Sequence, residues 1–110
     1  MEINIRHADS VLIAEIKGIL DTGTSEEAQN IISSYIEQGH KKFVINLEHT
    51  EYMSSSGLRV LLSTAKKLWA AEGTFRICAP NKLVKDILDT SGFSVIMDVV
   101  ESEEVALKGM

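Results

Sequence analysis

The run Phe43–Leu47 is almost entirely apolar, and an amphipathic helical pattern begins shortly after it, from Ser56 onward. A nearly continuous apolar run of this length is typical of a central strand that helices cover. In the helical pattern, apolar residues recur at spacings of three and four, and Gly73 ends the pattern. The residues expected to face the core are Leu58, Leu61, Leu62, Ala65, Leu68 and Trp69. A buried strand followed by such a helix predicts an α/β chain with parallel strands.

The residues before this run predict a hairpin and a first helix. Residues 3–7 alternate between apolar and polar side chains, and Val11–Ile16 is mostly apolar, which favours two paired antiparallel strands. Gly18–Asp21 then reads as a turn. A helix is expected to begin near Thr24, because Thr24 and Glu27 have the spacing of a capping box.

The residues after Gly73 continue the alternation of strands and helices. Thr74–Ala79 predicts a strand that Pro80 ends, and Asn81 is well placed to cap a third helix. Phe93–Val99 predicts a short final strand, and Glu101–Leu107 a last helix with an acidic start. The predicted fold class is therefore α/β: a mostly parallel mixed sheet with an N-terminal antiparallel hairpin, about five strands and four helices, in a single domain over residues 1–110.

Composition narrows the possible partners. The net charge is −5, and no cluster of Lys and Arg exceeds two residues in a row, so we expect no binding to nucleic acid. No apolar stretch approaches the roughly 18–20 residues that span a bilayer, and the N-terminal residues lack the features of a signal peptide. We therefore expect a cytoplasmic protein without membrane insertion.

The sequence holds no recognisable catalytic or metal-binding pattern. His49 is the only histidine close to the serines, and Met53 stands where the nucleophile elbow of a serine hydrolase would need a glycine before Ser55. Asp21 alone is too few ligands for a hard cation, and it is as readily a turn residue. Cys78, the only cysteine, lies in an apolar strand and is expected to be buried and inert. We predict no enzyme, no metal and no cofactor.

Three serines and a glycine, Ser54–Gly57, occupy the junction between the Phe43–Leu47 strand and the amphipathic helix predicted after it. Serine oxygens can accept bonds from the free N–H groups of a helix start, and the same position favours an anion such as a phosphate carried by a serine. The residues alone leave both interpretations open. The exposed side of that helix, with Arg59, Ser63 and Lys66, is either a docking face or a solvated one.

The element order, the Gly18–Asp21 turn, the Phe43–Leu47 strand and above all Tyr52–Leu58 resemble the STAS domain, which is named after sulfate transporters and anti-sigma factor antagonists. The resemblance covers nearly the whole chain, and the length resembles the antagonist branch. It implies helices packed mainly on one side of the sheet. The family signature reads Asp-Ser-(Ser/Ala)-Gly-(Leu/Ile), and the serine after the aspartate accepts a phosphate.

Carried onto this sequence, the resemblance makes Ser55 the phosphorylation site, whereas Ser54 stands where the family has its aspartate. Ser56 is expected to help start the helix, and Gly57 to permit a close approach of the backbone. The expected partner-binding residues are Asp21, Ser54, Ser56, Gly57, Leu58 and Arg59.

The function that the resemblance implies is partner switching. Unphosphorylated, the protein would bind an ATP-binding anti-sigma factor that is also a serine kinase, and so free a sigma factor. The kinase would phosphorylate Ser55, and a serine phosphatase would reverse the modification. The alternative is a constitutive STAS interaction domain in another signalling or transport-related complex, in which the loss of the aspartate has removed phosphoregulation.

Overall fold

The computed structural model describes all 110 residues, as six strands and five helices. The strands are β1 (Glu2–Ala8), β2 (Val11–Leu20), β3 (Lys42–Asn46), β4 (Thr50–Met53), β5 (Thr74–Cys78) and β6 (Asp98–Val100). The helices are α1 (Ser25–Glu37), α2 (Ser55–Ala70), α3 (Lys82–Thr90), α4 (Phe93–Ile96) and α5 (Glu103–Leu107).

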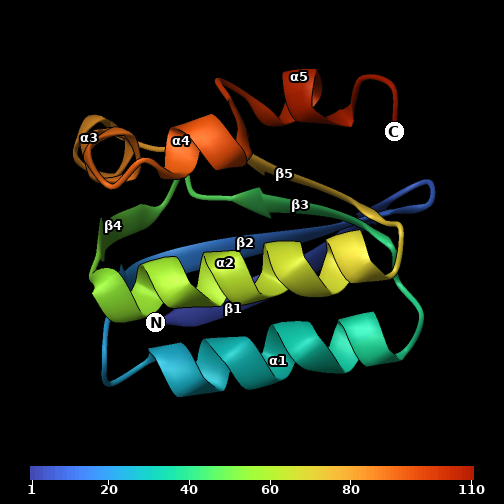
Figure 1. Cartoon of the computed structure of the whole chain (residues 1–110), viewed down its shortest axis with the longest axis horizontal. Helices are drawn as coiled ribbons and strands as arrows, with labels where there is room; N and C mark the ends of the chain where they lie inside the picture. Colours follow the sequence, from blue (N-terminus) through green and yellow to red (C-terminus); the bar gives the residue numbers. More distant parts are fainter.

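The strands form one mixed sheet in the order β1-β2-β3-β5-β6, and β4 pairs with β2 alone (Figure 1). The hairpin β1–β2 is antiparallel, from Ala8 opposite Val11 to Glu2 opposite Lys17. All other strand pairs are parallel. The predicted fold class is therefore confirmed.

The main core lies between one face of the sheet and the adjacent helices α1 and α2, while α5 covers part of the opposite face (Figure 1). Alternation along β2 sends its even-numbered residues Leu12, Ala14 and Ile16 to the first face and its odd-numbered Val11 and Ile13 to the second. The main core includes Phe43, Ile45 and Ile77 from the strands and Ile32, Leu61 and Leu68 from the helices. The smaller cluster consists of Val11, Ile13, Val44, Cys78 and Ala106.

The predicted turn at Gly18–Asp21 was wrong, because β2 continues through Leu20. The extension is paired by β4, a strand that was not predicted and that runs along β2 after β3 has ended. The buried Thr50 holds the start of β4 against β2, because its Oγ1 donates to the Ile16 carbonyl at 2.7 Å. Gly18 sits at the register shift with φ +93°, a conformation that favours glycine.

The predicted strand Phe93–Val99 was also wrong over most of its length. Residues 93–96 form the short helix α4, and only Asp98–Val100 pair with β5, as β6. Val95 and Ile96 are exposed, with 89% and 53% of their surface accessible, so their apolar character does not report burial in a sheet. Asn81 caps α3 as predicted, accepting a bond from the Val84 N–H at 2.8 Å.

Two expectations about helix details failed. The Thr24–Glu27 capping box does not form, because Thr24 Oγ1 donates to the Ile19 carbonyl and accepts from the Asp21 N–H instead. Trp69, expected to face the core, is 46% exposed near the end of α2. Its place next to the fully buried Leu68 puts it at the edge of the apolar stripe.

Candidate functional site

The ends of β2 and β4 bring together two segments that are far apart in the sequence. Leu20 lies opposite Met53 in the parallel register, so the residues that follow them, Asp21 and Ser54, leave the sheet at the same edge. The Ser54 N–H donates to the Leu20 carbonyl at 3.0 Å and ties the two ends together. The strand order therefore places the aspartate beside the serine run.

Gly57 lets α2 approach the end of β2 closely. A Cβ atom at this position would lie 2.6 Å from the Leu20 carbonyl oxygen and 2.7 Å from Met53 Cγ. Both distances are shorter than real Cβ contacts, so any side chain would push the helix away from the strand. The prediction that this glycine permits a close backbone approach is confirmed.

The three serines have different surroundings. Ser54 is the N-cap residue of α2, in an extended conformation, yet its Oγ makes no capping bond and is buried without a hydrogen-bond partner in the protein. Ser55 is the first residue of the helix and is exposed. Ser56 Oγ lies 3.1 Å from Thr22 Oγ1, which links the helix start to the turn after β2. Ser54, and not Ser56, therefore occupies the position that starts the helix.

Asp21 shapes the turn that faces the serines. Its carboxylate Oδ1 accepts from the Gly23 N–H at 2.9 Å and from Thr24 Oγ1 at 3.4 Å. Its backbone carbonyl accepts from the Ser25 N–H at 2.8 Å, at the start of α1. Of the two interpretations of Asp21, the structure supports the turn residue. It gathers no group of three or more His, Cys, Asp and Glu side chains that could hold a metal ion.

Two exposed apolar side chains flank the site. Ile19 and Tyr52 lie opposite each other in the β2–β4 register, and 45% and 44% of their surfaces are accessible. Residues that are paired across strands point to the same face of the sheet, so the two side chains form one patch. The sequence analysis missed this patch, because it depends on a strand that was not predicted.

The exposed side of α2 begins with Arg59, one turn after Ser55. A hollow of about 400 Å³ on this side is lined by Arg59, Leu62, Ser63, Lys66 and Lys67. Leu58, which follows the glycine, is half-buried against the main core. The helix thus turns an apolar side inward and a basic side outward, next to the serine run.

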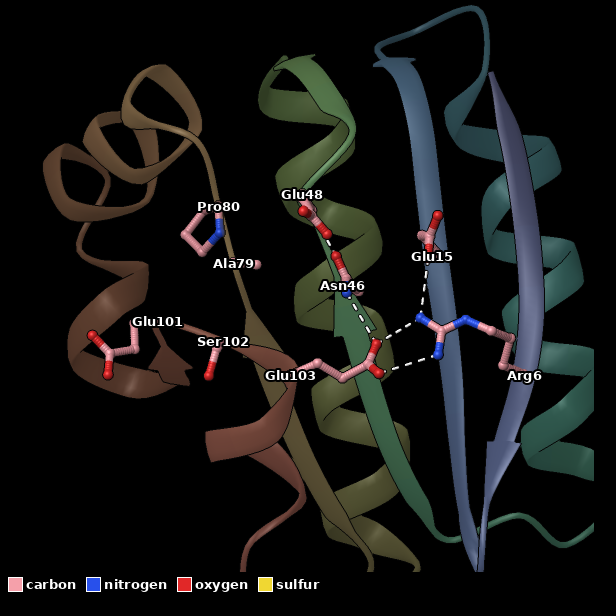
Figure 2. A pocket seen from close by; sticks show the side chains of 9 residues that line it. All are labelled: Arg6, Glu15, Asn46, Glu48, Ala79, Pro80, Glu101, Ser102 and Glu103. Atoms are coloured by element: carbon pink, nitrogen blue, oxygen red, sulfur yellow. Dashed lines mark hydrogen bonds and ion pairs between the residues drawn. The ribbon is translucent and has the colours of Figure 1, made fainter.

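A second hollow, of about 380 Å³, opens on the face of the sheet opposite α1 and α2 (Figure 2). Arg6 on β1 crosses it and binds Glu103 with two bonds, of 2.6 and 3.1 Å, and Glu15 with one of 3.0 Å. Asn46 donates to the same Glu103 carboxylate at 3.0 Å. This hollow contains no residue of the serine run or of the Asp21 turn, and its side chains tie the start of α5 to the sheet.

The pKa values of Arg6, Glu103 and Cys78, which lie away from the serine run, are shifted by hydrogen bonding and burial. Hydrogen bonding to Arg6 holds the pKa of Glu103 below its usual value, and the same pair raises the pKa of Arg6. Burial raises the pKa of the Cys78 thiol to about 12, with the Glu103 carboxylate acting in the same direction. Cys78 is thus buried, as expected, and His49 is an exposed turn residue.

The topology and the strand–helix junction define a small α/β domain that presents a serine at the start of a helix. The family model described as STAS domain matches residues 2–106. The chain therefore belongs to the STAS domain family, as the resemblance implied. No helix is both long and apolar enough to cross a membrane.

The relatives of this chain include anti-sigma factor antagonists. It is 32% identical to the anti-sigma F factor antagonist of Paenibacillus polymyxa over 108 residues, covering 97% of this chain and 92% of the relative. A solved anti-sigma factor antagonist from Mycobacterium paratuberculosis has a TM-score of 0.90 at 22% identity, covering 96% of this chain and 90% of the other. The Bacillus cell fate determinant SpoIIAA in its phosphorylated form has a TM-score of 0.75 at 24% identity, covering 96% of each chain.

Proposed function

We propose that this protein is an anti-sigma factor antagonist whose binding to its partner is controlled by phosphorylation of Ser55. The observation that carries the proposal is the position of Ser55. Its side chain is exposed at the first residue of α2, next to the edge where β2 and β4 end. Neither neighbouring serine is as available, because Ser54 Oγ is buried and Ser56 Oγ contacts Thr22.

The proposed partner is an ATP-binding anti-sigma factor that is also a serine kinase, in the cytoplasm. In the transfer, Ser55 Oγ bonds to the γ-phosphorus of ATP, the bond from that phosphorus to ADP breaks, and the hydroxyl proton passes to a base of the kinase. A serine phosphatase removes the phosphate again. SpoIIAA, which shares the fold, is known in a phosphorylated form, and this supports the proposal.

The phosphate would act on the interface and leave the fold unchanged. It adds about −1.5 to −2 charges at neutral pH. Ser55 is exposed, and the positive end of the helix dipole tolerates an anion, so the domain need not refold. An interface that faces the nucleotide phosphates of the kinase would be repelled by the new charge.

The partner-binding residues divide into those that shape the surface and those that touch the partner. Ser54, Ser56 and Gly57 hold the two segments together, and Asp21 shapes the turn after β2, through the contacts described above. Leu58 anchors α2 in the core. Arg59, with the patch of Ile19 and Tyr52, is exposed to a partner. Tyrosine and arginine are both enriched among the residues that contribute most to binding at protein interfaces.

Phosphorylation by the cognate kinase tests the proposal directly. Incubation with that kinase and ATP is expected to add one phosphate, which mass spectrometry of peptides locates at Ser55. Ser55→Ala should abolish the modification, whereas the matched change Ser56→Ala should preserve it. A phosphate that remains in the Ser55→Ala protein would contradict the assignment.

One observation favours the alternative, a constitutive interaction domain. Ser54 stands at the aspartate position of the family signature, and its buried hydroxyl carries no charge toward a kinase. In that case the partner would bind the Ser55→Asp protein as tightly as the unmodified one. A marked loss of affinity in Ser55→Asp would argue for the phosphorylation switch instead.

A further inference from the structure

Arg59 lies on the same face of α2 as Ser55. The two are the fifth and the first residues of the helix, and residues four apart are surface neighbours, with Cβ atoms about 5–6 Å apart. Helical side chains lean toward the N-terminus, so a long side chain at position 59 can cover the turn that begins with Ser55. Both residues are exposed.

The guanidinium of Arg59 has no anionic partner in the unmodified protein. It forms no ion pair with any of the sixteen Asp and Glu residues and no side-chain hydrogen bond, and none of the residues lining its hollow is acidic. The first turn of α2 also lacks an acidic residue. At the start of the second turn, Arg59 gains no stabilisation from the helix dipole, which favours an anion at this end of the helix.

Several carboxylates lie on the elements around the start of α2. Asp21 lies across the strand edge, Glu51 is exposed on β4, and Glu26 and Glu27 occupy the first turn of α1, which packs alongside α2. Arg59 is the only cation among residues 51–65. A phosphate at the helix start would therefore have one cationic side chain within its own segment.

We propose that Arg59 binds the phosphate carried by Ser55, so that phosphorylation withdraws this cation from the partner-binding surface. The inference rests on the proposed function, because it takes Ser55 as the phosphorylation site. Without the phosphate, Arg59 is free to meet an acidic group of the partner. With it, the pair changes from one positive charge to about half to one negative charge. One modification thus removes an attractive contact and adds a repulsive one.

The test uses the full chain with phosphoserine incorporated at position 55 during synthesis, so that no kinase is required. The second ionisation of the phosphate, ordinarily near pH 6, is followed by ³¹P NMR. Binding to Arg59 favours the dianion, so Arg59→Gln is expected to raise the midpoint by roughly 0.3–0.7 pH unit. Arg59→Lys should recover part of this shift, since it keeps the charge but loses the planar fork.

Lys66→Gln is the matched control. It removes the same charge from the same side of α2, but at roughly 16 Å along the helix from Ser55, compared with about 6 Å for Arg59. The inference is overturned if Arg59→Gln moves the midpoint no further than Lys66→Gln does. This outcome is distinct from a failure of the proposed function, which would appear as equal partner binding by the phosphorylated and unmodified chains.

Discussion

Ser54 is an N-cap residue that does not cap. Its Oγ makes no hydrogen bond although it is buried, whereas Asn81, the N-cap of α3, both accepts from the Val84 N–H and donates to the Thr50 carbonyl. A serine at this position ordinarily stabilises a helix through its side chain. Here the start of α2 is held by the backbone bond from Ser54 to Leu20 and by the close approach at Gly57.

Alanine substitutions at the two N-caps should therefore differ. Ser54→Ala removes an unpaired buried hydroxyl and is expected to change the free energy of unfolding by no more than about 0.5 kcal/mol in either direction. Asn81→Ala should cost about 1–2 kcal/mol, because two hydrogen bonds are lost. Urea unfolding of both variants measures the difference. A loss of 1 kcal/mol or more in Ser54→Ala would show that the hydroxyl does cap α2.

Gly57 offers a second test at the scale of one residue. Gly57→Ala places a methyl group against the Leu20 carbonyl and should lower the free energy of unfolding by about 2–3 kcal/mol. Gly23→Ala is the control in the same site, since its Cβ would meet only Asp21 Oδ1, at an ordinary 3.4 Å. Similar unfolding midpoints for the two variants in urea would contradict the close packing of α2 on β2.

Among the elements, β4 contributes most to the candidate site. It pairs with β2, positions Met53 and the serines, and exposes Tyr52. If the Ile19–Tyr52 patch binds the proposed anti-sigma factor, Tyr52→Ala is expected to weaken that binding about tenfold, because tyrosine is enriched among the few interface residues that contribute more than 1 kcal/mol. Isothermal titration calorimetry with the unmodified protein measures the effect.

The control is Trp69→Ala, which removes a side chain of nearly equal exposure, 46% against 44%. Trp69 lies about 20 Å along α2 from Ser55, outside the proposed interface. Trp69→Ala should therefore leave the affinity for the proposed partner unchanged. Equal losses in the two variants would remove the Ile19–Tyr52 patch from the interface.

Hydrogen bonds and an ion pair attach the helix α5 to the sheet. Its first residue, Glu103, accepts bonds from Arg6 and Asn46, while Arg76 donates to the carbonyls of Ala106 and Lys108 at 2.7 and 2.6 Å. Arg6 is 43% exposed, so solvent weakens its pair with Glu103. Glu103→Gln should lower the free energy of unfolding by about 1 kcal/mol at pH 7.

The contribution of Glu103 to the free energy of unfolding should depend on pH. The pKa of Glu103 is lower in the folded protein than in the unfolded chain, where it is about 4.3. Its contribution is therefore complete above that value and is lost as the pH falls through the lower, folded value. Wild type and Glu103→Gln should converge at acid pH. Glu104→Gln, an exposed neighbour without an ion pair, should behave like wild type at every pH, and a difference that persists in acid would contradict the ion pair.

The elements with a strong apolar period were predictable from the sequence, and those set by tertiary pairing were not. Phe43–Leu47 and the helix after the serines carry their own signal, because burial repeats along them. Thr50–Met53 is too short to show alternation and is a strand only because β2 continues past β3. The same distinction explains the site: the serine run was identified from its place before a helix, and Ser55 within it from the resemblance to the family signature, whereas Ile19 and Tyr52 depended on the unpredicted β4.

The whole molecule combines a net charge of −5 with a cationic hollow that begins one turn after Ser55. The unmodified surface thus offers a partner positive charge and an apolar patch at one end of an acidic domain. A phosphate at Ser55 would reverse the local charge while the sheet and helices stay in place. We therefore expect phosphorylation to change partner binding through the charge at Ser55, without a change of fold.

The affinity of the anti-sigma factor for the two forms of the protein tests this account most directly. We predict that the chain with phosphoserine at position 55 binds the anti-sigma factor of the same cell at least about tenfold more weakly than the unmodified chain, as the scale of like charges at an interface implies. Circular dichroism should show the same fold for both forms. Equal dissociation constants for the phosphorylated and unmodified chains would contradict the switch at Ser55.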